Sequence, residues 1–75
     1  MSFNARLTSD LIKIAAAGGG FRLDAAARLT SDLINIATAA KSGGASVTFA
    51  GMSARLTSDL IKIGAAGGGA VCFED

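Results

Sequence analysis

The sequence predicts an α/β fold, a short β/α solenoid in which four parallel strands carry three helices on one face. Three observations support this prediction. The chain contains three near-identical segments, each segment has the start and stop signals of a short helix, and short alternating apolar and polar stretches separate the helices. The predicted order of elements is therefore β-α-β-α-β-α-β.

The repeat is an octapeptide, Ala-Arg-Leu-Thr-Ser-Asp-Leu-Ile, that occurs letter for letter at residues 5–12, 27–34 and 54–61. The middle copy departs after the octapeptide, because Asn35 stands where the outer copies have Lys13 and Lys62. A repeat of roughly 22 to 27 residues is typical of a solenoid, and recent duplication or consensus design would each produce such identity. The predicted single domain, 1–75, therefore divides into units at 2–20, 21–45 and 46–69, with a closing strand at 70–75.

Strands are predicted wherever apolar and polar residues alternate between the repeats. The first is the short stretch Ser2-Phe3-Asn4, followed by Phe21–Asp24, Val47–Phe49 and Val71–Glu74. Period-two alternation turns the apolar side chains toward the helices. The predicted strand residues of the core are Phe3, Phe21, Leu23, Val47, Phe49, Val71 and Phe73.

A helix of about ten residues is predicted to begin at each octapeptide. In the first copy Thr8 is the expected N-cap, Asp10 lies in the first turn where the helix dipole favours a carboxylate, and Leu7 is expected to pack on Ile12 as a hydrophobic staple. Glycines after the helix supply the left-handed residue that ends it. The same roles fall to Leu29, Thr30, Asp32 and Ile34 in the second copy and to Leu56, Thr57, Asp59 and Ile61 in the third.

The helical connections between strands predict parallel pairing with right-handed crossovers. Near-identical repeats favour equivalent positions for all three helices on a single side of the sheet. A small flavodoxin-like sheet with helices on both faces is the alternative fold.

A resemblance to a known family follows from the stretch that runs from Val47-Thr48-Phe49 to Gly69, with its strand, loop and Leu-Thr-x-x-Leu helix. It resembles the β/α unit of ribonuclease-inhibitor-type leucine-rich repeats. That family's Asn or Cys after the strand is absent, and Asp24 and Gly51 stand nearby instead. The resemblance implies a solenoid geometry and a role in protein–protein interaction, and it transfers no binding residue.

Composition excludes several classes of function. Histidine is absent and Cys72 is the single cysteine, so a disulfide within the chain, a metal cage and a Ser-His-Asp arrangement are not expected. A net charge of +1 gives little attraction for nucleic acid, and the apolar runs are too short for a membrane span. We therefore expect a non-enzymatic protein without cofactors, cytoplasmic by default because no signal peptide is evident.

Two sets of residues are candidates for self-association. A chain of 75 residues buries only about 60% of its unfolded surface, so association would add stability, and end units without polar caps leave strand edges that template another chain. The predicted self-association edges are Ser2, Phe3, Asn4, Val71, Cys72, Phe73 and Glu74. Stacked repeats should also align an inter-repeat polar ladder of Arg6, Asp10, Arg28, Asp32, Arg55 and Asp59, in which arginine and aspartate pair at i, i+4.

The predicted function is that of a structural repeat protein that assembles with itself into a filament or a closed ring. The alternative is a small interaction module that binds a protein partner through the outer face of the sheet. That face would carry Ser2, Asn4, Arg22, Asp24, Thr48, Cys72 and Glu74.

Overall fold

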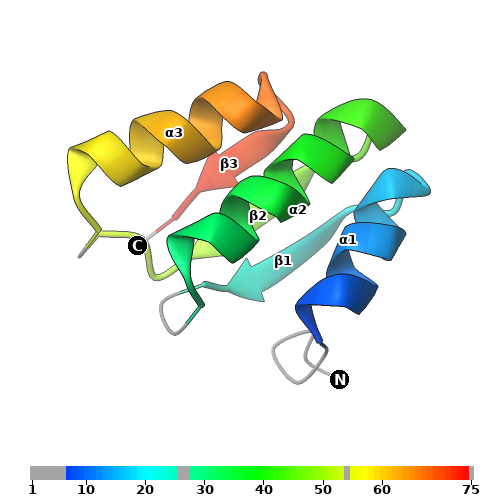
Figure 1. Cartoon of the computed structure of the whole chain (residues 1–75), viewed down its shortest axis with the longest axis horizontal. Coiled ribbons are helices and arrows are strands. Elements are labelled where there is room, and N and C mark those ends of the chain that lie inside the picture. Colours follow the sequence, from blue (N-terminus) through cyan, green and yellow to red (C-terminus); the bar gives the residue numbers. More distant parts are fainter. Residues whose placement is uncertain (1–6, 26–27, 54, 75) are drawn as a thin grey trace.

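The computed structural model of the chain describes residues 7–25, 28–53 and 55–74. Helices and strands alternate along these residues (Figure 1). Their order is α1 (Thr8–Ala16), β1 (Phe21–Asp24), α2 (Thr30–Gly43), β2 (Val47–Ala50), α3 (Thr57–Gly67) and β3 (Val71–Phe73).

The three strands form one parallel sheet in the order β1-β2-β3, with the three helices lying side by side on one of its faces (Figure 1). The register is straight: Val47 is paired with Phe21 on one side and with Val71 on the other. Each unit therefore repeats the position of the unit before it, one strand further along the sheet.

The prediction of four strands is wrong by one, because the sheet of the described residues has three. The strand predicted at Ser2-Phe3-Asn4 lies outside those residues. That stretch was a weak candidate on physical grounds, since Phe3 is its one apolar residue and serine and asparagine have low strand propensity. The structure is a small α/β fold of three helices and three parallel strands.

The core lies between the helix layer and the sheet. Phe21, Leu23, Val47 and Phe49 are buried, as their alternation predicts, whereas Arg22 and Asp24 face solvent on the other side of the sheet. Val71 is only half-buried and Phe73 is exposed, so the third strand departs from the predicted core. The helices complete the core with Leu11, Ala15, Leu33, Ile36, Ala37, Ala40 and Ile63.

The prediction of the helix starts is wrong in two respects, namely the residue at the N-cap and the hydrogen bond expected from its side chain. The N-caps are Leu7, Leu29 and Leu56, without a capping hydrogen bond from their side chains, and the threonines occupy the first helical position. The hydrophobic staple does not bury these leucines either, since each is about 70% exposed. The hydroxyls of Thr8 and Thr30 instead accept hydrogen bonds from arginines of the following unit.

Glycines end α2 and α3 as predicted, whereas the C-cap of α1 is Ala17 in the right-handed conformation, followed by Gly18 with a positive φ. Gly44 and Gly68 are the C-caps of α2 and α3, both in the left-handed conformation, and the backbone N–H of Gly68 donates to the Gly64 carbonyl. The helix α2 is longer than α1, with 14 residues against 9, because its sequence continues through alanines and Lys41 before the first glycine.

The close approach of α1 and α2 depends on Gly43, the last residue of α2. A Cβ atom at this position would overlap the backbone carbonyl oxygens of Ala15 and Ala16 near the end of α1. Those oxygens belong to rigid main chain and cannot move aside as a flexible side chain can. The absence of a side chain at Gly43 therefore sets the spacing of the first two helices.

We expect Gly43→Ala to lower the free energy of unfolding by about 1–3 kcal/mol, the usual cost of overpacking a tight interior contact. Urea denaturation followed by circular dichroism measures this change. The gain in helix propensity from alanine, about 1 kcal/mol at most, works against the effect and makes the direction informative.

Gly64→Ala is the matched control within α3. The nearest atom to the new Cβ would be Phe73 Cε2 at 3.9 Å, an ordinary contact, and Gly64 lies at the position that alanine occupies in α1 and α2. This variant should be as stable as the parent or more stable by up to about 1 kcal/mol. Equal losses in both variants would contradict the proposed close contact at Gly43.

Candidate functional site

Each helix has two apolar flanks on either side of the stripe that faces the sheet. In α1 the residues that face the sheet are Leu11 and Ala15, both fully buried. Helix geometry places Ile12 on one side of this stripe and Ile14 on the other. Thr8 shares the flank of Ile12, since residues four apart lie on the same face. We call the flank of Thr8 and Ile12 the following side and that of Ile14 the preceding side.

The following side is covered wherever the next unit exists. Ile12 in α1 and Ile34 in α2 are half-buried, whereas Ile61, their equivalent in α3, is 64% exposed. Leu60 changes in the same way, because it is only partly buried while Leu11 and Leu33 are inaccessible to solvent. The difference arises from the neighbour and not from the sequence, which is identical at these positions.

The preceding side shows the complementary pattern. Ile36 in α2 and Ile63 in α3 are fully buried, and both helices have a helix before them in the sheet order. Ile14, their equivalent in α1, stays half-buried. The two ends of the array thus expose opposite halves of one contact, which the chain forms twice internally.

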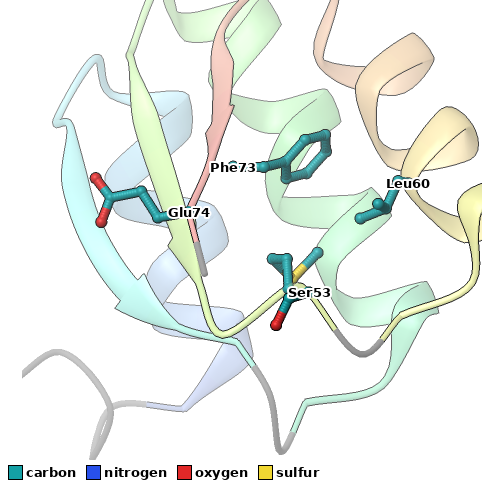
Figure 2. Close-up of a pocket in the computed structure, with 5 residues that line it drawn as sticks. Ser53, Leu60, Phe73 and Glu74 are labelled. Atoms are coloured by element: carbon teal, nitrogen blue, oxygen red, sulfur yellow. The ribbon is translucent and has the colours of Figure 1, made fainter.

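The third strand and its surroundings form a shallow apolar pocket at the α3 end. Phe73 is 37% exposed, whereas Leu23 and Phe49, which occupy the same register position in β1 and β2, are fully buried. Figure 2 shows the Phe73 ring and the Leu60 side chain facing the pocket, with the Glu74 carboxylate on the opposite side of the strand. The pocket has a volume of about 110 Å³ and is lined by Met52, Ser53, Leu60, Phe73 and Glu74.

One backbone edge of β3 also points away from the sheet. The Ala70 carbonyl and both backbone groups of Glu74 bond to β2 or to the turn after it. Because backbone groups alternate in direction along a strand, those of Val71 and Phe73 point to the unpaired edge. We call Thr57, Leu60, Ile61, Phe73 and this edge of β3 the open end.

Polar contacts join neighbouring units through arginine. The Nη1 group of Arg28 donates to Thr8 Oγ1 at 2.8 Å, and Nη1 of Arg55 donates to Thr30 Oγ1 at the same distance. Arg55 Nη2 donates further to the Ala25 carbonyl, at 2.7 Å, and to the Arg28 carbonyl. Each arginine therefore ties its own unit to the unit before it.

This arrangement differs from the predicted polar ladder. Among the described residues no ion pair joins Arg55 to Asp59, and the contacts of Arg55 go to a hydroxyl and to carbonyl oxygens. The three aspartates lie half-buried in the first helical turns, where they were predicted. Arg6 lies outside the described residues. The exact recurrence of Thr two residues after Arg was the sequence signal for the observed pairing.

Of the predicted self-association edges, those at the C-terminal side lie where they were expected. Val71, Cys72 and Phe73 form β3, and Glu74 follows directly. Cys72 is a free, exposed cysteine on the outer face of the sheet. Ser2, Phe3 and Asn4 lie outside the described residues, so the geometry of the opposite edge stays a prediction.

The outer sheet face carries an ion pair across the strands. Arg22 Nη2 in β1 lies 2.8 Å from Glu74 Oε1, and its Nε also donates to this oxygen. Thr48 in β2 lies between the two strands in register with Arg22 and Cys72. Both charged side chains remain in contact with solvent, so their attraction is worth at most about 1 kcal/mol.

Thr30→Val should lower the free energy of unfolding by about 1–2 kcal/mol. Valine keeps the shape of threonine but removes the acceptor of Arg55 Nη1, a part-buried hydrogen bond from a charged donor. Chemical denaturation measures the loss.

Thr57→Val is the control: this exposed hydroxyl has no hydrogen-bond partner among the described residues, and its removal should leave the monomer's stability unchanged. Equal stability of both variants would show that the arginine contacts add nothing to the fold.

Comparison with protein families, with curated proteins and with solved structures gives no match to this chain. Within residues 7–25, 28–53 and 55–74, none of the helices has the length and apolar character needed to traverse a lipid bilayer. The same residues contain no group of three or more His, Cys, Asp or Glu side chains that could hold a metal ion. The difference in exposure between equivalent residues of the three units makes the open end and its complement on α1 the candidate functional site.

Proposed function

We propose that this protein is a non-enzymatic structural repeat protein that assembles with itself, end to end, into a filament or a closed ring. The open end of one copy receives the preceding side of α1 from the next copy. The contact so formed repeats between copies the contact that α1 makes with α2, and α2 with α3, inside each chain.

The observation that carries the proposal is the change in exposure among identical residues. Ile61 is 64% exposed and Leu60 partly exposed, whereas the same residues of α1 and α2 are covered by the unit that follows them. Full burial of an Ile or Phe side chain contributes roughly 1.5–3 kcal/mol. Covering Ile61, Leu60 and Phe73 together would therefore provide a substantial part of the free energy that a specific association requires.

The geometry of the units favours a head-to-tail contact. The two exposed halves lie at opposite ends of the array, so a copy that docks with one end leaves its other end available. Such a heterologous contact gives a ring when the rotation between copies closes and a filament when it does not. Hydrogen bonds to the free backbone edge at Val71 and Phe73 would add the directionality that apolar burial lacks.

The outer sheet face supports the alternative function less well. Its charges at Arg22 and Glu74 are already paired with each other, and it carries none of the large exposed apolar residues of the described chain. Interfaces draw most of their energy from buried anchor residues, which the open end offers and the outer face does not.

Ile61→Lys should abolish assembly without unfolding the chain. Lysine replaces an exposed isoleucine, so the monomer loses little, but its ammonium group would be buried unpaired in the contact. Light scattering on a gel-filtration column, over a wide range of concentrations, should show masses well above 7.4 kDa for the parent and the monomer mass for the variant.

Leu29→Lys is the matched control, because Leu29 is also exposed but lies at the N-cap of the middle helix, away from the open end. It should assemble as the parent does. A parent chain that elutes as a monomer at every concentration would refute the proposal, and so would equal loss of assembly in both variants.

A further inference from the structure

The contacts of Arg55 define a binding site for a guanidinium group. Its Nη1 and Nη2 groups reach three acceptors of the preceding unit, namely the Thr30 hydroxyl and the carbonyls of Ala25 and Arg28. Two of these acceptors are main chain, held in place by the turn in which the Arg28 N–H donates to the Ala25 carbonyl at 3.1 Å. The planar guanidinium group carries several N–H donors and can reach these separated oxygens at once, whereas a single ammonium group cannot.

The same turn recurs one unit later, but within the described residues no arginine of a following unit binds to it. The Arg55 N–H donates to the Met52 carbonyl at 3.1 Å, as Arg28 does to Ala25, and Thr57 begins α3 as Thr30 begins α2. The equivalent acceptors are the Thr57 hydroxyl and the carbonyls of Met52 and Arg55. The residues that the structure describes supply no side-chain donor to any of the three.

We infer that these acceptors form an arginine cradle that binds Arg6 of a second copy. Arg6 is the third arginine of the repeated octapeptide, and it precedes Thr8 as Arg28 precedes Thr30 and as Arg55 precedes Thr57. Arg28 and Arg55 each bind the unit before their own. By the same register, Arg6 would bind acceptors of a unit that lies on the preceding side of α1. In an end-to-end assembly the open end of another copy supplies this unit.

An acidic residue that follows Thr57 closely in the sequence favours the same occupant. Asp59 lies in the first turn of α3, close in sequence to Thr57, and gives this end of the helix a negative charge. The half-buried Leu60 and the exposed Ile61 follow it on α3. A docked copy would therefore bring an arginine to the acidic helix start while its α1 covers the apolar residues. This inference rests on the proposed self-assembly and assigns its polar contacts.

The test compares assembly of the parent with that of Thr57→Val and Arg6→Ala, by the protein concentration at which half of the chains are assembled in sedimentation velocity. Thr57→Val should raise this concentration about tenfold, and Arg6→Ala about a hundredfold, because hydrogen bonds from a charged donor are lost. Combining the two changes should cost little more than Arg6→Ala alone, since both remove one contact. Arg6→Lys keeps the charge without the fork and should fall between the parent and Arg6→Ala.

Ser58→Ala and Lys13→Ala are the controls, since they remove an exposed hydroxyl beside Thr57 and an exposed cation from α1. Both should assemble as the parent does, and circular dichroism should show every variant folded. A parent that assembles while Thr57→Val and Arg6→Ala match it would overturn the cradle and leave self-assembly standing. Additive losses in the double variant would also overturn it, because the two residues would then act separately. A parent that never assembles overturns both.

Discussion

The fold depends on lateral contact between neighbouring β/α units. One unit is a short helix on a short strand, and alone it would leave both flanks of its helix in water. Ile36 becomes inaccessible to solvent, and Ile12 half-buried, only because a neighbour lies on the appropriate side. Stability in such an array is close to a sum of small unit terms and larger interface terms. The number of helix flanks that a neighbouring unit covers therefore determines a large part of the stability of the fold.

Apolar packing and arginine hydrogen bonds make different contributions to the contact between neighbouring units. Apolar packing supplies most of the free energy, but it tolerates sliding of one helix along another. The arginine contacts fix the register, because Arg55 has to reach Thr30, Ala25 and Arg28 at once. Gly43 sets the distance between α1 and α2, because a side chain at this position would overlap the backbone carbonyl oxygens at the end of α1. Energy, register and spacing thus come from different residues of the same short repeat.

Much of the fold could be predicted from the sequence, because the features concerned are local. Alternation predicted strands at Phe21–Asp24 and Val47–Phe49, where β1 and β2 (Val47–Ala50) lie, and glycines predicted the ends of α2 and α3. The number of strands was predicted wrongly, because the sheet of the described residues has three strands and the fourth was predicted at residues 2–4, outside them.

The chemistry of the site was harder to predict than the elements. Local spacing favoured Arg–Asp pairs within one helix, as at Arg55 and Asp59, and favoured Thr as the helix cap. The structure uses Thr30 and Arg55 to join two units, 25 residues apart in the chain. Such a contact becomes visible only when units are placed side by side in a straight register. The exposure of Ile61 likewise depends on what lies beside it, since the same sequence at Ile12 is half-buried.

The straight register of the sheet has a consequence for how such a gene could change. Val47 pairs with Phe21 and with Val71 at one level, so each unit is displaced from the last by a single sideways step. Recombination between the repeated stretches would add or remove a whole step and leave both terminal surfaces chemically as they are. Variation in length would then change the width of the sheet while the residues exposed at its two ends stay the same.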